Sequence, residues 1–124
     1  MTKINREALF ALHKQICAEC LVIMEMKNRD YAGHKADADP FANFRDSGTL
    51  LNMHPGKGLL IRVIDKFKRI TSFIDAGTLA VKDEPVQDAI KDIINYMVLL
   101  YGMIEDEKRA EWPTPTKPGD AGEW

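Results

Sequence analysis

The sequence predicts an all-α fold, a bundle of three long helices connected by one long loop. Apolar residues recur at helical spacing in three segments, whereas no convincing run alternates as a strand would and no internal repeat is present. The 124 residues, 45% hydrophobic and 29% charged, fit one domain of ordinary composition. We expect this domain over residues 1–110 and a Pro-rich flexible tail over residues 111–124.

The first helix is predicted over about residues 5–27, where no Pro or Gly interrupts the apolar spacing. Cys17 and Cys20 fall in this segment, with His13 one turn earlier. These residues could bind zinc, but no second Cys or His pair follows at zinc-finger spacing. We therefore favour the interpretation of both cysteines as core residues with free thiols.

Residues 28–57 are predicted to form a long loop, because Gly, Pro, Asn and Asp are frequent there. Loops of this length are uncommon in small domains, and they are often functional or contain short helices. His34 and His54 lie in this segment and could be proton shuttles, phosphate contacts or bystanders.

The second helix is predicted over residues 58–75 and is closed by Gly77. Its expected inward-facing residues are Leu60, Val63, Ile64, Phe67, Ile70 and Ile74. The third helix is predicted to begin near Pro85, with Asp83 as N-cap, and to continue to about Arg109. Apolar residues lie on nearly every side of the third helix, so we expect self-association as a homodimer or homotetramer.

A polar stripe on the third helix is the strongest functional signal. Glu84, Asp88, Asp92 and Asn95 follow one another at steps of four, four and three residues, which puts them on one helix face. Stacked carboxylates repel one another, and a hard cation such as Mg²⁺ is their natural counter-charge. A solvated acidic face is the alternative, but Tyr96 shares the same face, which favours a cleft.

Charge and hydropathy exclude other classes. The net charge of −2 and pI near 5.9 argue against general attraction to nucleic acid or anionic membranes. The first twenty residues lack a signal-peptide pattern, and no apolar run is long enough for a membrane span. We expect a cytoplasmic protein with no membrane partner.

Four segments, residues 26–33, 40–45, 65–70 and 84–96, resemble the phage and bacterial family called nucleotide modification associated domain 1. That family resembles the all-α MazG-like and dimeric dUTPase-like nucleotide pyrophosphohydrolases. The most specific elements are Lys-x-x-Asp-Tyr, Asp-Lys-x-x-Arg and Glu-x-x-x-Asp-x-x-x-Asp-x-x-Asn-Tyr, in that order. The resemblance covers about residues 20–104 and implies a bacterial or phage-infected cell.

The resemblance implies Mg²⁺-dependent hydrolysis of a nucleoside triphosphate, or a related nucleotide, to monophosphate and pyrophosphate, with Mn²⁺ as a substitute metal. Glu84 and Asp88 match the acids of the principal metal-binding helix, Asp92 lies one turn beyond as a further metal candidate, and Glu25 is the candidate acid from the first helix. Glu25 and Asp88 are the catalytic candidates. The usual first-helix Glu-x-x-Glu pair is absent, since Glu19 and Glu25 are six residues apart, and Asp30 is an alternative acid.

The remaining candidates would bind the nucleotide. The phosphate-binding candidates are basic, and those for the base are aromatic or carry an amide. They are Lys27, Arg45, Lys66 and Arg69 for phosphate, and Tyr31, Phe41, Asn43, Phe44, Asn95 and Tyr96 for the base, with Asp30 beside them. Two rival functions remain: a helical module that binds or sequesters nucleotides, or acts as an inhibitor, without catalysis, and a purely structural oligomer.

Overall fold

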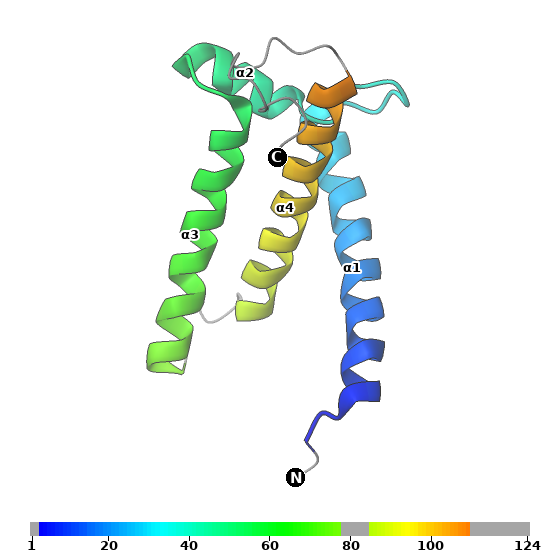
Figure 1. Cartoon of the computed structure of the whole chain (residues 1–124), viewed down its shortest axis with the longest axis vertical. Coiled ribbons are helices and arrows are strands. Elements are labelled where there is room, and N and C mark those ends of the chain that lie inside the picture. The colour runs from blue at the N-terminus through cyan, green and yellow to red at the C-terminus, as the bar shows by residue number, and fades with distance from the viewer. Residues whose placement is uncertain (1–2, 78–84, 110–124) are drawn as a thin grey trace, which may run out of the picture.

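The computed structural model describes residues 3–77 and 85–109, and every regular element in these ranges is an α-helix. The elements are α1 (Arg6–Ala32), α2 (Ala42–Leu51), α3 (Pro55–Ala76) and α4 (Val86–Arg109). The long helix α4 lies between α1 and α3, and α2 crosses one end of the three (Figure 1). The all-α prediction is confirmed, with α1, α3 and α4 as its three long helices.

The predicted loop is shorter than expected, because helices extend into it from both sides and α2 lies inside it. Helix α1 continues to Ala32 and ends at Gly33, whose φ of 107° suits glycine. Helix α3 begins at Pro55, whose fixed φ and missing N–H fit the first helical position. It ends at Gly77, as predicted. The proposed N-cap Asp83 and the Pro-rich tail lie outside the described residues.

The turn between α2 and α3 depends on Gly48. A Cβ atom on this residue would lie 2.7 Å from the backbone oxygen of Met53, which is closer than real Cβ contacts allow. Asn52 then takes the left-handed conformation, with φ of 51°, and ends α2. The close approach brings the start of α3 against the end of α2.

The core lies at the end of the molecule where α2 meets the long helices. Phe41, Phe44, Leu59 and Met103 are buried there, and Tyr96, Leu99 and Leu100 pack against them. A second junction joins α1 to α4, where the amide nitrogen of Asn95 donates to the backbone oxygen of Cys20 over 3.0 Å. Cys20 is buried, as predicted, but Cys17 is exposed, which corrects the prediction for that residue.

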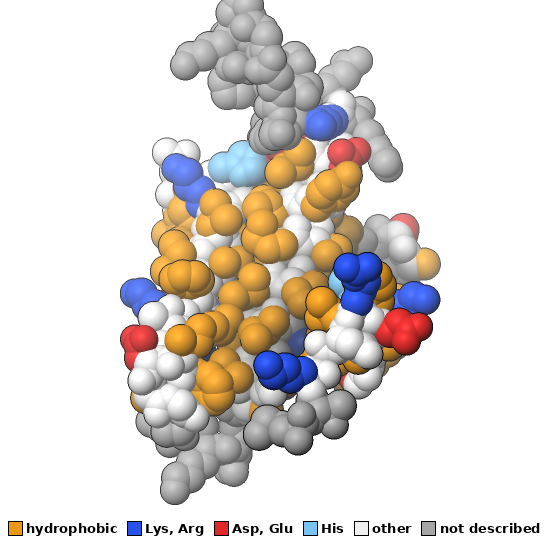
Figure 2. Space-filling view, turned by 60° about the horizontal axis from the view of Figure 1, so that its bottom comes forward, with side chains coloured by type: hydrophobic (Ala, Val, Ile, Leu, Met, Phe, Trp, Pro, Cys, Tyr) orange, Lys and Arg blue, Asp and Glu red, His pale blue; other side chains and the backbone are white. Residues whose placement is uncertain are grey.

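Many large apolar side chains of residues 3–77 and 85–109 are exposed. Helices α1 and α3 each pack on α4, so the three form one layer, and no other long helix of the described residues lies on its faces. Figure 2 shows apolar side chains gathered over one face. Four residues expected to face inward are at least 44% exposed, which corrects that prediction. They are Leu60, Ile64, Phe67 and Ile74. None of the helices in the described ranges is long and apolar enough to span a membrane.

His54 has a structural position that the sequence did not reveal. It is the N-cap of α3, where its Nδ1 accepts from the backbone N–H of Gly56 over 3.0 Å. Its Nε2 lies 2.5 Å from Oε1 of Glu107, a carboxylate whose side chain is only 2% exposed. Because Nδ1 is an acceptor, the ring proton lies on Nε2 and faces this carboxylate. His54 therefore caps one helix and pairs with a buried charge on another.

Replacing His54 with Ala is expected to lower the free energy of unfolding by about 2 kcal/mol, because the substitution removes a cap and leaves a buried carboxylate without this partner. His54→Asn is the matched variant, since Asn is a good N-cap but is too short to replace the imidazole at Glu107. Urea denaturation should show a smaller loss for His54→Asn. Equal stability of His54→Ala and wild type would contradict the assigned role.

Candidate functional site

Two adjoining pockets share Lys27 and Asp92; residues of all four helices line the first, and residues of α1, α3 and α4 line the second. We call the first the aromatic pocket. It is lined by Met24, Lys27, Asn28, Tyr31, Pro40, Asn43, Phe44, Arg62, Asp92, Asn95, Tyr96 and Leu99. We call the second the basic pocket. It is lined by Ile23, Lys27, Lys66, Arg69, Asp88, Ala89, Lys91 and Asp92.

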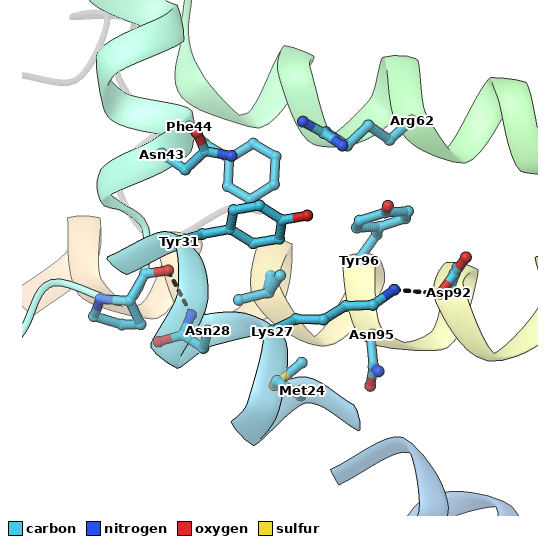
Figure 3. Close-up of a pocket in the computed structure, with 12 residues that line it drawn as sticks. Met24, Lys27, Asn28, Tyr31, Asn43, Phe44, Arg62, Asp92, Asn95 and Tyr96 are labelled. Carbon is cyan, nitrogen blue, oxygen red and sulfur yellow. Dashed lines mark hydrogen bonds and ion pairs between the residues drawn. The ribbon is translucent and has the colours of Figure 1, made fainter. Parts of the chain in front are cut away.

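Asp92 is the centre of the arrangement. The Nζ atom of Lys27, from α1, lies 3.2 Å from Oδ1, and the Nζ atom of Lys66, from α3, lies 3.0 Å from Oδ2. The Asp92 side chain is 16% exposed, so this carboxylate is sheltered. Three helices thus meet at a single acidic side chain. Figure 3 shows the Lys27 side chain extending across the aromatic pocket to its ion pair with Asp92.

The aromatic pocket has flat apolar walls with polar groups among them. Tyr31 and Tyr96 come from α1 and α4, and Phe44 comes from α2 (Figure 3). The guanidinium carbon of Arg62 lies 5.5 Å from the centre of the Phe44 ring, a cation–π distance. Asn28 donates its amide to the backbone oxygen of Pro40 over 3.0 Å, which ties α1 to the segment before α2. The pocket could hold a planar group by stacking.

The basic pocket carries twice as many basic as acidic side chains. Four basic residues line it against two carboxylates, those of Asp88 and Asp92. Asp88 is exposed, one helical turn before Asp92 on the same face of α4. Within residues 3–77 and 85–109, no basic side chain forms an ion pair with Asp88. These four side chains are N–H donors that an anionic ligand could use.

Lys91 has a separate partner. Its Nζ lies 2.8 Å from Oε2 of Glu19 on α1, and Gln15 donates to the other oxygen of Glu19 over 3.0 Å. Hydrogen bonds from Lys91 and then Gln15 lower the pKa of Glu19 below its ordinary value of 4.5. The same bond to Glu19 raises the pKa of Lys91.

A depressed carboxyl pKa stabilises the folded state above the ordinary pKa, and this stability is lost as the pH falls through the folded value. Wild type should therefore melt at a higher temperature than Glu19→Gln at pH 7, and the difference should disappear as the pH falls below about 4.5. Parallel thermal melts across this range measure it. A difference that persists in acid would contradict the ion-pair explanation.

The structure brings together most of the predicted site residues. Nine of them line the two pockets: Lys27, Tyr31, Asn43, Lys66, Arg69, Asp88, Asp92, Asn95 and Tyr96. Phe44 also lines the aromatic pocket, while Phe41 belongs to the core. Asn95 borders the aromatic pocket, although its amide nitrogen is bonded to the Cys20 carbonyl.

Four predicted residues lie elsewhere or outside the described chain. Glu25 is 53% exposed, lines neither pocket, and lies 3.9 Å from the guanidinium of Arg29 one turn later on α1. Asp30 is exposed and also lines neither pocket. Arg45 pairs with Asp39 and Asp106, at 2.9 and 2.6 Å, at the α2 end of the molecule. Glu84 lies outside the described residues.

Three polar residues of the pockets were missed. Arg62 precedes Lys66 by one turn and Arg69 by two, so the sequence contained a basic stripe on α3 that parallels the acidic stripe on α4. Asn28 and Lys91 gave no comparable signal, since each is an ordinary polar residue on a helix.

The oxygen atoms of these pockets suit a metal ion that is bound by both protein and ligand better than one bound by protein side chains alone. The described residues contain no group of three His, Cys, Asp or Glu side chains placed to hold an ion. Asp88 and Asp92 nevertheless supply two carboxylates one turn apart at an anion-binding pocket. Protein-bound Mg²⁺ is commonly held by one or two carboxylates with phosphate oxygens and water. The residues therefore fit Mg²⁺ only together with a phosphate.

Comparison with known proteins adds no further assignment, since no protein-family profile, curated protein or solved structure matches this chain.

Proposed function

We propose that this protein is a Mg²⁺-dependent nucleotide pyrophosphohydrolase that converts a nucleoside triphosphate, or a related nucleotide, to the monophosphate and pyrophosphate. The observation that carries the proposal is the pairing of an aromatic pocket with a basic pocket through Lys27 and Asp92. A nucleotide has a matching pair of parts, with a flat base at one end for the aromatic pocket and a polyanion at the other for the basic pocket. The resemblance in sequence motifs supports the same reaction.

In this proposal the base stacks in the aromatic pocket, where Tyr31, Phe44 and Tyr96 offer ring faces. Lys27, Lys66 and Arg69 donate to the phosphate oxygens and stabilise the charge that develops during transfer. The two ends of the ligand are thereby fixed, which positions the α-phosphate near the two carboxylates.

Hydrolysis then requires a water oxygen to bond to the α-phosphorus as the bond to the bridging oxygen breaks and pyrophosphate leaves. Asp88 accepts a proton from this water, because its carboxylate faces the basic pocket without an ion pair among the described residues. When bound by Asp88, Asp92 and phosphate, Mg²⁺ supplies Lewis-acid polarisation of the phosphoryl oxygens and a lower pKa for bound water.

The direct test is to incubate the purified protein with each ribonucleoside and deoxyribonucleoside triphosphate and Mg²⁺, and to measure monophosphate and pyrophosphate. Equimolar release of these two products supports the enzyme. Release of orthophosphate alone, or no turnover, would overturn the proposal. Tight nucleotide binding without turnover would instead support a sequestering protein.

We further propose that the working form contains at least two copies of the chain. The support is the exposed apolar face on α3 and α4, formed by Leu60, Ile61, Ile64, Phe67, Met97, Val98 and Tyr101, each at least 43% exposed. A second copy of the chain presents the same face, and a two-fold pairing would bury both together. Monomeric proteins rarely expose apolar patches this extensive.

Replacing Phe67 with Glu is expected to shift the protein to a smaller species, because Phe67 is 62% exposed on this face and burying the new carboxylate would be costly. Light scattering after size exclusion gives the mass. Leu50→Glu is the matched control, since Leu50 is 84% exposed on α2. A wild-type protein that is monomeric at micromolar concentration would contradict self-association through this face.

A further inference from the structure

The two ion pairs of Asp92 restrict what this carboxylate can bind. Both of its oxygens lie within 3.2 Å of a lysine ammonium, and the two lysines come from different helices. A divalent cation approaching Asp92 would have to displace at least one ammonium and would be repelled by both. Asp92 in this arrangement is therefore a poor ligand for a metal alone.

A phosphate changes this balance. Lys27 and Lys66 both line the basic pocket, and an ammonium has three N–H donors, so each can turn from the carboxylate to a phosphate oxygen. The side chain of Lys27 is 53% exposed and that of Lys66 is 30% exposed, which leaves both ends accessible to a ligand. A phosphate dianion competes well with a single carboxylate for these donors.

We propose that Lys27 and Lys66 form a phosphate-responsive clasp on Asp92. When a phosphate enters the basic pocket, the two lysines bind it and release the carboxylate, which then becomes available to a divalent cation. The inference rests on the proposed function for the nature of the ligands. It adds that phosphate binds first and makes Asp92 available to the metal. By linkage, bound phosphate and bound cation must then raise each other's affinity.

Binding of Mn²⁺, followed by the EPR signal of the free ion, tests the clasp without turnover. In the variant Lys27→Met/Lys66→Met, the affinity for Mn²⁺ without phosphate is expected to rise about tenfold or more over wild type. Lys91→Met is the matched control, because Lys91 lines the same pocket but pairs with Glu19. Removing the charge of Lys91 changes only the electrostatic potential around the site, so the affinity for Mn²⁺ is expected to rise by less than about threefold.

Inorganic phosphate supplies the second measurement. In wild type, phosphate is expected to raise the affinity for Mn²⁺ about tenfold, and in the double variant this effect should disappear. Asp92→Asn in the same buffers corrects for Mn²⁺ bound by phosphate in solution. Far-UV circular dichroism checks folding, and Lys66→Met alone replaces the double variant if that protein does not fold.

An equal rise in Mn²⁺ affinity in Lys91→Met and in Lys27→Met/Lys66→Met would overturn the proposal, because it would show that only the overall charge of the pocket matters. Mn²⁺ affinity that is unaffected by phosphate in wild type, or binding too weak to detect in every variant, would also overturn it. These outcomes are independent of hydrolysis. Coupled binding without turnover supports the clasp and contradicts the proposed enzyme, whereas turnover without coupling contradicts the clasp alone.

Discussion

Replacing Asp88 with Asn is expected to lower the rate of pyrophosphate release by at least about 100-fold while the fold is retained. Asp88 would accept the proton of the attacking water and share the metal, and an amide can do neither well. The side chain is exposed and has no ion pair within the described residues, so the substitution leaves no buried charge behind. The measurement is the initial rate of pyrophosphate release at saturating nucleotide and Mg²⁺.

The matched control is Glu105→Gln. Glu105 lies further along the same helix, near Lys108 at 3.9 Å, and lines neither pocket. Its loss removes the same charge from α4 without touching the site, so the rate should stay within about twofold of wild type. Equal rates for Asp88→Asn and wild type would remove Asp88 from the mechanism. A melting temperature far below wild type would instead indicate a structural role.

The helices could be predicted from the sequence because their signals are local. The apolar spacing and the absence of Pro and Gly define α1, and Gly77 ends α3 by adopting a left-handed conformation. The start of α3 was placed three residues late, since Pro55 was taken as a loop residue rather than as the first residue of a helix. A short helix in the loop was considered, but α2 could not be located from the sequence, because Asn43 and Gly48 are typical of turns.

The partners of each side chain could be predicted less well, because they depend on how the helices pack. The stripe on α4 suggested that its acids would be sheltered, which holds for Asp92 but not for the exposed Asp88. Only packing shows that the partners of Asp92 are Lys27 and Lys66. Arg45 looked like a phosphate ligand in its motif, yet it pairs with Asp39 and Asp106. Helical periodicity gives the face of a residue and carries no information about what covers that face.

The same limit explains the inward-facing residues of α3. Periodicity correctly grouped Leu60, Ile64 and Phe67 on one stripe, but no helix of the described ranges covers them. An amphipathic helix has the same pattern whether its apolar face meets its own chain or another copy. The error in burial is therefore itself an argument for self-association.

If the two pockets bind different parts of the nucleotide, a substitution in each pocket should weaken the binding of a different ligand. Tyr96→Leu is expected to weaken binding of a nucleoside monophosphate about tenfold or more, because aromatic stacking on a base contributes roughly 1–3 kcal/mol. Inorganic pyrophosphate has no base, so its affinity should change little. Lys66→Met is expected to weaken pyrophosphate binding by at least about tenfold through loss of a charged donor.

Calorimetric titration of each ligand into wild type and into each variant measures all six affinities. The informative quantity is the ratio of the monophosphate to the pyrophosphate dissociation constant, since it should rise in Tyr96→Leu and fall in Lys66→Met. Both residues border a pocket that shares Asp92, so general damage to the site would weaken both ligands alike and leave this ratio near its wild-type value. An unchanged ratio in both variants would therefore show that the base and the phosphates are not recognised by separate pockets.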